Sequence, residues 1–586
     1  MKKSLEKILA DALAALPEAL VPADARAVTV AVERTRDDGH GDFASNLALR
    51  LARPSGRSPR LLAQALVDSL PAHPGIARVE VAGAGFINFF LHPGAYAAEL
   101  GRILELGSAY GRSRSGAGRL VTVEFVSANP TGPLHVGHGR HAAFGATLAN
   151  LLEATGYRVH REYYVNDAGR QMEILAASTW LRYLERCGEE ITFPANGYRG
   201  DYIAEIAGRL FADEAMRLRR DAGELFRDLP PDEPRGGDKD AYIDALIVRA
   251  RLLIGEEDFR RIQGLSLGLI LADIREDLEE FGVRFDRWFA ESSLAADGSV
   301  TRAIDELKRT GQAYLKDGAL WFRSTAFGDE KDRVMVRENG FPTYFASDIA
   351  YVFNKLSRGF EQLIYVWGAD HHGYIARVRA GLVALGGDAT RFEVRLVQFV
   401  SLYRGGEKAQ MSTRSGEFVT LRDLRREVGN DAARLFYVMR SNDQHLDFDL
   451  ELATARSNDN PVYYIQYAHA RVASVMRQLA ERGMAHDTAH GMACIARLVE
   501  PQELQLIKRL CGFGEIIEQC AAERTPHTLV HYLREAANDF HTNYTAHQFI
   551  VEDPGLRNAR LNLALAAQTV IRSGLELLGV SAPDSM

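Results

Sequence analysis

The fold is decided by residues 120–138, which read LVTVEFVSANPTGPLHVGH. The apolar run 120–126 has the length and the β-branched content of a buried strand. Prolines and a glycine then form a turn, and a helical pattern continues over 135–154. A second strand-like run, 158–165, follows at once. This order is that of a βαβ unit, so we predict an α/β domain built on a parallel sheet.

The turn His135-Val136-Gly137-His138 carries residues suited to phosphate chemistry. The start of a helix offers unpaired N–H groups and the positive end of its dipole. Histidines three residues apart lie on one side of the first turn, where both can donate to phosphate oxygens. Gly137 leaves room for a nucleotide base or ribose on the backbone. The alternatives are two surface histidines or a zinc pair, although helical zinc pairs prefer a four-residue spacing. The pattern favours an ATP site.

A second motif, residues 407–416, reads EKAQMSTRSG and follows a strand-like run at 395–400. A glycine-flanked loop that contains Lys408, Ser412 and Arg414 is suited to bind a triphosphate. The alternative is a polar hairpin loop without a catalytic role.

Together the two motifs resemble the HIGH and KMSK signatures of class I aminoacyl-tRNA synthetases. Over nearly the whole chain, the sequence resembles the arginyl-tRNA synthetases of the bacterial kind. The stretches that carry this resemblance are 41–46 (GDFASN), 83–88 (GAGFIN), 127–130 (SANP), 341–350 (FPTYFASDIA), 411–416 (MSTRSG), 430–434 (NDAAR), 466–471 (QYAHAR) and 577–583 (LLGVSAP).

The resemblance implies a Rossmann-like, parallel-sheet catalytic domain at 111–455, interrupted by an insertion at about 185–260. It also implies an N-terminal α+β domain at 1–110 that contacts tRNA, and an all-helical, DALR-like anticodon-binding domain at 456–586. The implied activity is arginine–tRNA ligation. L-arginine reacts with ATP and Mg²⁺ to give arginyl-adenylate and pyrophosphate, and arginine then passes to the 3′-terminal ribose of tRNA(Arg).

The resemblance also implies the site residues. The expected arginine-binding residues are Glu124, Ser127, Asn129, His135, Tyr344 and Asp348. The expected ATP-binding residues are Pro130, Thr131, Gly132, His135, Gly137, His138, Gln410, Met411 and Ser412. The expected catalytic residues are His135, His138, Lys408, Ser412 and Arg414. The expected tRNA-binding residues are Tyr463, Tyr467 and Arg471.

Within the arginine set, Asp348 is the expected partner of the guanidinium group, because a carboxylate matches its planar fork of donors. Asp348 lies four residues after Tyr344, so one helical turn would direct both side chains the same way. A capping Asp at a helix start is the alternative. The family also has a glutamine near 370–372, where this chain reads Asp-His-His. Adjacent histidines point apart, so we do not expect a metal site there.

Bulk properties exclude several classes of protein. The formal net charge of −8 argues against general coating of nucleic acid, but not against one specific RNA partner. No run of about 18 apolar residues is present, so no membrane span is expected. The four cysteines form no C-x-x-C pair, so protein-bound zinc is not expected. Cys511 and Cys520 could pair in an oxidising compartment, but we expect reduced thiols in a monomeric, cytoplasmic protein.

Other functions remain open at this level. The chain could be another class I synthetase, or a small H-x-G-H adenylyltransferase, although the latter is far shorter and lacks the helical tail. A non-catalytic RNA-binding paralogue would bind tRNA without charging it. The presence of His135, His138 and Asp348 argues against that reading.

One departure from the family pattern gives a testable prediction. The second lysine of KMSK is Thr413 here, and Gly132 occupies the position where relatives with such a gap carry a compensating lysine. We hypothesise that Lys408 supplies the missing charge. Lys408→Ala should then lower ATP–pyrophosphate exchange, and a loss of less than threefold would contradict the hypothesis.

Overall fold

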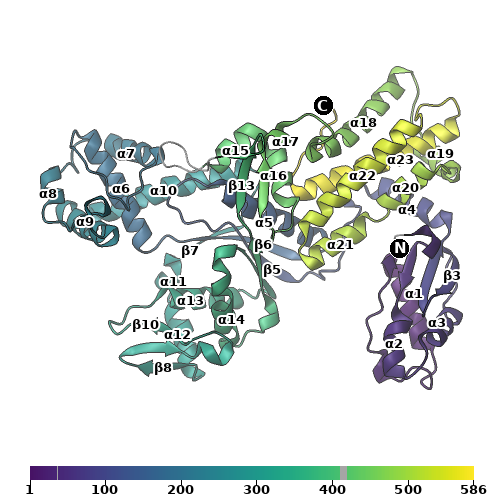
Figure 1. Cartoon of the computed structure of the whole chain (residues 1–586), viewed down its shortest axis with the longest axis horizontal. Coiled ribbons are helices and arrows are strands. Elements are labelled where there is room, and N and C mark those ends of the chain that lie inside the picture. The colour runs from purple at the N-terminus through teal and green to yellow at the C-terminus, as the bar shows by residue number, and fades with distance from the viewer. Residues whose placement is uncertain (36, 410–418) are drawn as a thin grey trace.

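The computed structural model describes residues 1–35, 37–409 and 419–586. A central sheet connects a helical insertion, a small unit with an antiparallel sheet, an N-terminal unit and a C-terminal helical unit (Figure 1). The predicted fold class is confirmed. No helix in the described part of the chain is long and apolar enough to span a membrane.

The central sheet has five parallel strands in the order β12-β11-β5-β6-β7. The order reverses at β5, so the loops that leave β5 and β11 diverge at the carboxyl edge, where open α/β sheets bind ligands. The strands are β5 (Leu120–Glu124), β6 (Arg158–Val165), β7 (Arg287–Ala290), β11 (Gln362–Gly368) and β12 (Phe392–Val397).

Helix α5 (Val136–Ala154) connects β5 to β6 as predicted, and most of its residues are buried. The connection between β7 and β11 forms the small antiparallel unit, whose strands have the order β10-β9-β8. Its elements, with α14 after β11, are α11 (Ser292–Ala296), α12 (Ser299–Arg309), β8 (Ala313–Lys316), β9 (Ala319–Phe322), β10 (Arg333–Val336), α13 (Tyr344–Ser357) and α14 (Ile375–Ala384).

The predicted single strand at 395–400 is wrong in one respect, because the chain leaves the sheet after Val397. The N–H of Gln398 donates to Asn442 O, and Phe399 O accepts from the N–H of Leu446. These bonds redirect the chain into a second sheet. That sheet and the helices beside it comprise β13 (Val400–Arg404), β14 (Glu407–Lys408), α15 (Leu421–Val428), α16 (Asn430–Val438), β15 (Leu446–Asp449) and α17 (Leu450–Thr454).

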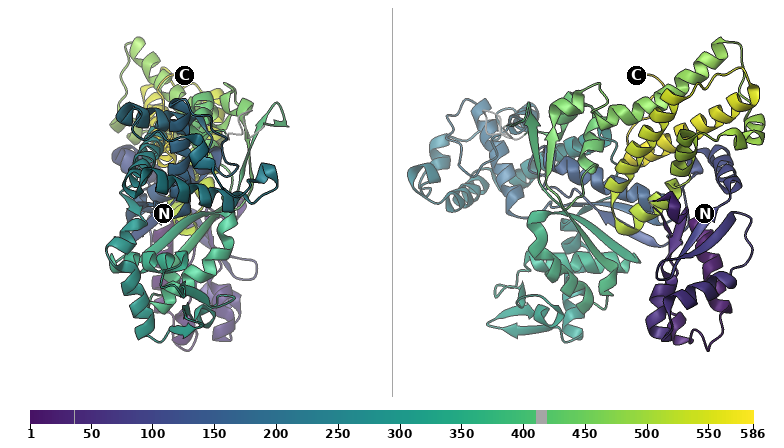
Figure 2. Two further views of the ribbon diagram at one scale, coloured as in Figure 1. Left: turned by 90° about the vertical axis from the view of Figure 1, so that its left-hand side faces the viewer. Right: turned by 45° about the vertical axis from the view of Figure 1, so that its right-hand side comes forward.

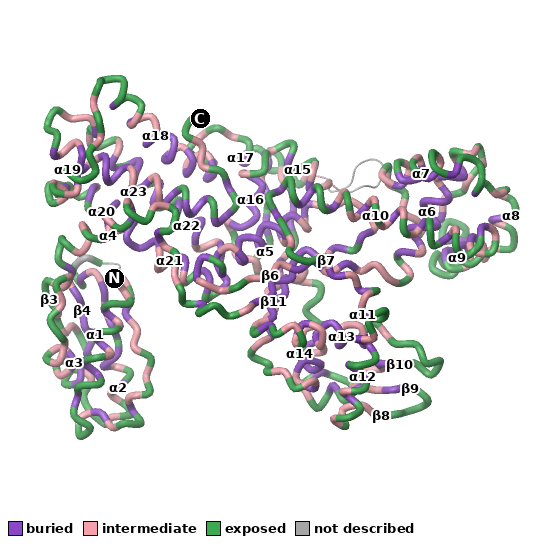
Figure 3. The backbone as a smooth tube through the Cα atoms, turned by 180° about the vertical axis from the view of Figure 1, so that it is seen from behind, coloured by how far each residue is buried: buried purple, intermediate pink, exposed green. Residues whose placement is uncertain are grey.

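The insertion is entirely helical, and its helices extend beyond the predicted 185–260. It has its own core around the fully buried Trp180, visible as a separate purple interior in Figure 3. The helices are α6 (Arg170–Arg186), α7 (Asp201–Glu214), α8 (Ala222–Phe226), α9 (Lys239–Ile254) and α10 (Glu256–Glu280).

The N-terminal unit packs three helices against a four-stranded sheet of order β1-β2-β4-β3. The first strand of this sheet is short, since only Glu33–Arg34 pairs with β2. Arg34 also joins this unit to the helical unit by an ion pair with Glu515 at 2.7 Å, and Figure 2 shows the two units adjacent. The elements are α1 (Lys2–Ala15), β1 (Glu33–Arg34), β2 (Phe43–Ser45), α2 (Leu47–Ser55), α3 (Pro59–Asp68), β3 (Ile76–Ala82), β4 (Phe86–Leu91) and the connecting α4 (Pro93–Leu106).

The C-terminal unit is all-helical, and its last helix, α23, contacts α18, α22, α4 and α5. Arg434 fastens this helix to the catalytic unit, because its buried guanidinium donates to Leu578 O and Phe281 O. All four cysteines are free thiols. The helices are α18 (Pro461–Glu481), α19 (Thr488–Ala493), α20 (Pro501–Leu510), α21 (Phe513–Glu523), α22 (Pro526–Ala546) and α23 (Pro554–Leu578).

Candidate functional site

The two histidines of the turn cap helix α5 and stack on each other. Nδ1 of His135 accepts from the N–H of Gly137 at 3.0 Å, and Nδ1 of His138 accepts from the N–H of His135 at 3.2 Å. The rings are 3.6 Å apart. Burial lowers the pKa of both histidines, most strongly that of His138, so both are neutral at pH 7. A neutral ring that accepts at Nδ1 carries its proton on Nε2. Each ring therefore has an Nε2–H to donate.

The backbone around this turn is tightly constrained. A Cβ on Gly137 would lie 2.8 Å from Cε1 of His135, so glycine is needed for the histidine pair itself. A Cβ on Gly132 would lie 2.9 Å from the hydroxyl of Tyr202 in α7, which donates to Thr131 O. Val126 and Ser127 both have positive φ values (67° and 41°), an unfavourable conformation for side-chain-bearing residues and one that clusters at functional sites.

The turn is also paired with a distant segment of backbone. The N–H of Leu421 donates to Leu134 O at 2.7 Å, and the N–H of Val136 donates to Val419 O at 3.2 Å. These bonds form a bridge between His135 and Thr420. The chain that follows the second motif therefore lies against the first motif.

Of the second motif, only its flanks lie within the described residues. Lys408 is exposed and lies on β14, paired with Tyr403 of β13. It is therefore on a short strand and not in a loop. Gln410, Met411, Ser412 and Arg414 lie outside the described residues.

Three acidic side chains from separate elements lie close enough for Asp348 to feel the charges of the other two: Glu124 at the end of β5, Asp348 in α13, and Glu291, directly after β7. Burial and the charges of Glu291 and Glu124 raise the pKa of Asp348 to about 7, although Arg377 acts in the opposite direction. Burial also raises the pKa of Glu291. Burial therefore disfavours the charged form of both carboxyl groups, and the neighbouring acids disfavour it further at Asp348.

The remaining predicted arginine-site residues surround these acids. The hydroxyl of Ser127 donates to Glu124 Oε1 at 3.5 Å and accepts from the N–H of Tyr164. Oδ1 of Asn129 lies 3.3 Å from the side-chain amide of Asn166. Tyr344 is 61% exposed. Its hydroxyl lies close to Gly169, because a Cβ on that glycine would be only 2.9 Å from the hydroxyl oxygen.

A buried network of ion pairs connects Lys355 and Arg358 to Glu124 on β5 and Glu162 on β6. Nζ of Lys355 is 2.5 Å from Glu124 Oε2 and 3.8 Å from Glu162 Oε1, and the lysine side chain has no exposed area. Glu162 also accepts from Arg358 and from the Tyr351 hydroxyl. Burial alone would raise the pKa of Glu162, but the bonds from Arg358 and the charge of Lys355 hold it well below its ordinary value. Lys355 and Arg358 thus balance Glu124 and Glu162. The charge of Arg377 acts on Asp348, but burial and the neighbouring acids still keep the pKa of Asp348 high.

The Asp-His-His stretch is exposed and follows β11. Nε2 of His371 lies 3.5 Å from Asp370 Oδ2, and both side chains are more than half exposed. Within 1–35, 37–409 and 419–586, no group of three or more His, Cys, Asp or Glu side chains is arranged to hold a metal ion.

The predicted tRNA-binding residues form one aromatic cluster on the helical unit. Tyr463 and Tyr467 stack with centroids 5.7 Å apart, and the Arg471 guanidinium lies over Tyr467 and Tyr544, at 4.4 and 4.7 Å. All three predicted residues are partly exposed. His469, on the same helix, is instead a core residue that contacts Pro583 O.

The sequence analysis missed Glu291, Lys355 and Arg358. Glu291 follows a four-residue strand, β7, that was not predicted. Lys355 and Arg358 follow Asp348 by seven and ten residues, and this helical spacing could have been read from the sequence. The spacing does not identify their acidic partners, Glu124 and Glu162, because these lie on strands β5 and β6.

The Lys355 network gives a prediction about stability. Lys355→Met removes one partner of a buried ion pair and leaves Glu124 without its cation, while Glu162 keeps Arg358. This should cost roughly 3–5 kcal/mol. Thermal unfolding should show a clearly lower midpoint. Lys308→Met is the matched control, because its pair with Asp305 is exposed and contributes little. Equal midpoints for the two variants would contradict the assignment.

Comparison with known proteins identifies the family. Residues 2–91 match the "Arginyl tRNA synthetase N terminal domain", residues 99–449 the "tRNA synthetases class I (R), catalytic domain", and residues 465–586 the "DALR anticodon binding domain". The chain is 58% identical to the arginine–tRNA ligase of Thioalkalivibrio sulfidiphilus and 54% identical to that of Halorhodospira halophila, with all of each chain covered. It superimposes on the arginyl-tRNA synthetase of Thermus thermophilus with a TM-score of 0.73 at 25% identity, again over both whole chains. The chain therefore belongs to the arginyl-tRNA synthetase family of class I aminoacyl-tRNA synthetases.

Proposed function

We propose that this protein activates L-arginine with Mg²⁺-ATP and transfers it to the 3′-terminal ribose of tRNA(Arg). The observation that carries the proposal is the set of converging carboxyl groups, Glu124, Asp348 and Glu291, beside the histidine turn. A cationic amino acid supplies the positive charge that this site lacks. Its carboxylate then reaches toward the turn, where phosphate-binding groups lie.

In this proposal Asp348 and Glu291 share the guanidinium group of arginine. Two carboxylates are the natural partners of a planar fork with five donors. Glu124, Ser127 and Asn129 hold the α-amino and α-carboxylate groups at the end of β5. Tyr344 covers the opening, and its exposed ring becomes buried when arginine is bound.

ATP binds at the start of α5, in contact with Pro130, Thr131, Gly132 and Gly137. The arginine carboxylate attacks the α-phosphorus in line, and pyrophosphate leaves. His135 and His138 donate their Nε2–H groups to phosphate oxygens as negative charge develops. Positioning and charge stabilisation supply the catalysis. The cations and donors of the second motif, Lys408, Gln410, Met411, Ser412 and Arg414, act on the leaving pyrophosphate.

We further propose that the chain divides into the N-terminal, catalytic and helical domains predicted at 1–110, 111–455 and 456–586. The aromatic cluster of Tyr463, Tyr467 and Arg471 binds unpaired tRNA bases by stacking, a mode that needs few cations and suits a chain of net charge −8. The protein acts in the cytoplasm as a monomer. These assignments are inferred from the family and the composition.

Charging of purified tRNA with radiolabelled amino acids tests the proposed function. Arginine should be the only good substrate, and Asp348→Asn should lower kcat/KM for arginine by at least a hundredfold, because the carboxamide cannot pair with the guanidinium. Charging with another amino acid would reject the proposal. Binding of tRNA without charging would favour the non-catalytic alternative.

The raised pKa of Asp348 predicts a pH-dependent KM for arginine. Below a pKa of about 7, the carboxyl group is protonated and neutral, so protons compete with arginine. The KM should rise about tenfold between pH 8 and pH 6, since each pH unit below the pKa lowers the ionised fraction about tenfold. The kcat at saturating arginine should change less. In Asp348→Asn this pH dependence of KM should disappear, and its persistence would show that another group is responsible.

A further inference from the structure

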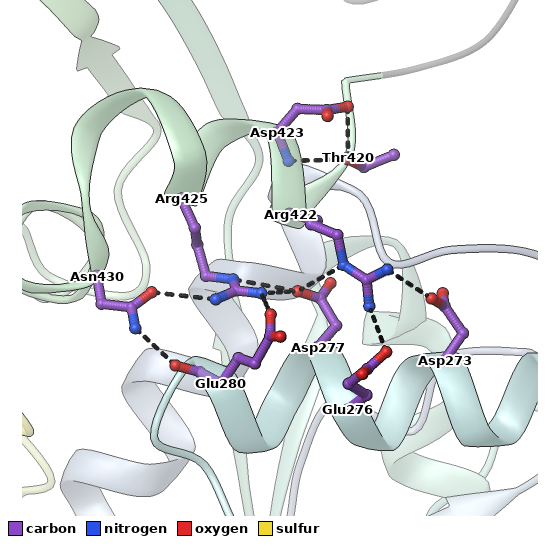
Figure 4. Close-up of polar contacts among 9 residues, drawn as sticks. All are labelled: Asp273, Glu276, Asp277, Glu280, Thr420, Arg422, Asp423, Arg425 and Asn430. Carbon is purple, nitrogen blue, oxygen red and sulfur yellow. Dashed lines mark hydrogen bonds and ion pairs between the residues drawn. The ribbon is translucent and has the colours of Figure 1, made fainter.

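Helix α15 begins directly after the segment that pairs with the histidine turn, and it is fastened to a helix from the insertion. Arg422 and Arg425 project from α15 toward the last turns of α10, where four acidic residues face them (Figure 4). Thr420 caps α15 by accepting from the N–H of Asp423 at 3.0 Å. The cap fixes the start of α15 beside the histidine turn, and the ion pairs of Arg422 and Arg425 fix α15 against α10. We call this connection, residues 419–425 with the acidic face of α10, the link.

Arg425 is the centre of this link. Its Nη2 donates to Asp277 Oδ1 at 2.5 Å and to Glu280 Oε2 at 2.6 Å, and its Nη1 donates to Asn430 Oδ1 at 3.2 Å. Both Arg425 and Asp277 are buried. Asn430 returns a bond to Glu280 O at 2.6 Å. A guanidinium held on several sides at once has a single orientation, which a lysine could not reproduce.

Arg422 extends the contact by one turn along α10. Its Nη1 lies 2.9 Å from Asp273 Oδ1, and its Nη2 lies 3.4 Å from Glu276 Oε2. Two arginines thus face four carboxylates, so the acidic face of α10 depends on both. Burial raises the pKa of Asp277 even though Arg425 acts to lower it. Loss of Arg425 would leave that buried carboxyl group without its main counter-charge.

The link transmits its geometry to the histidine turn through direct contacts. The Leu421 N–H bonds to Leu134 O, and the Leu421 side chain is fully buried against α5. A Cβ on Gly139 would lie only 2.6 Å from Cδ1 of Leu421, so helix and side chain already touch. A shift of α15 would therefore move the backbone at residues 134–136, and with it the ring of His135.

We propose that Arg425, through Asp277, is a positioning residue for adenylate formation, and that it holds residues 419–421 against the turn that presents His135 to ATP. The inference rests on the proposed activation of arginine by ATP. It concerns only the ATP side of the site. The arginine side is braced separately by Lys355 and Arg358.

The test compares Arg425→Met with the wild-type protein in ATP–pyrophosphate exchange, with tRNA present. The variant should lose at least tenfold in kcat and should show a raised KM for ATP, while the KM for arginine stays within twofold. Glu427→Gln is the matched control. Glu427 lies on α15 and forms an ion pair at 2.6 Å with Arg404 of β13. The substitution removes this pair, which does not involve α10. This control should keep its kcat within twofold.

The exchanged pair Arg425→Asp with Asp277→Arg should recover part of the lost kcat, because the attraction is restored in reverse. If Arg425→Met does not fold, Asp277→Asn tests the same link with a smaller change in shape. A folded Arg425→Met or Asp277→Asn variant with kcat within threefold of wild type overturns the inference. So does an equal rise in the KM values of ATP and arginine. Failure of the wild-type protein to exchange pyrophosphate with arginine would instead overturn the proposed function.

Discussion

The buried pairing of Lys355 with Glu124 and Glu162 is the interaction on which the site depends. It spans two adjacent strands at the carboxyl edge of the sheet, where solvent cannot screen it. Burying two carboxylates without a cation is costly, so the lysine permits Glu124 to be buried at the end of β5. With Glu124 and Glu162 balanced, Asp348 and Glu291 remain as buried acids with raised pKa values. In the proposed function, the guanidinium group of arginine supplies their counter-charge.

A second constraint acts on the phosphate side. The histidine turn is held by its own capping bonds and by backbone bonds to residues 419–421. Both sets of bonds fix the position of the turn and the directions of its two histidine rings. The catalytic strand–turn–helix is thus completed by a segment almost 300 residues later in the chain. The ion pairs between α15 and α10 extend this support to the insertion.

The local parts of the fold were predictable, and the parts set by distant contacts were not. The strand 158–165 and the helix after the turn match the structure closely, because their patterns lie within single segments. The break at Gln398 and Phe399 depends on Asn442 and Leu446, which the local pattern does not reveal. Likewise Asp348 was predicted as the guanidinium partner, whereas Glu291 was missed because its strand is short.

In the proposed function, the acidic site selects arginine by charge. Calorimetric titration with L-arginine and with L-citrulline tests this directly, because citrulline has nearly the same shape but a neutral urea group in place of the guanidinium. The account predicts that arginine binds at least a hundredfold more tightly at pH 8, where the carboxyl groups are ionised, and that this preference shrinks at pH 6. Equal affinities at pH 8 would contradict it.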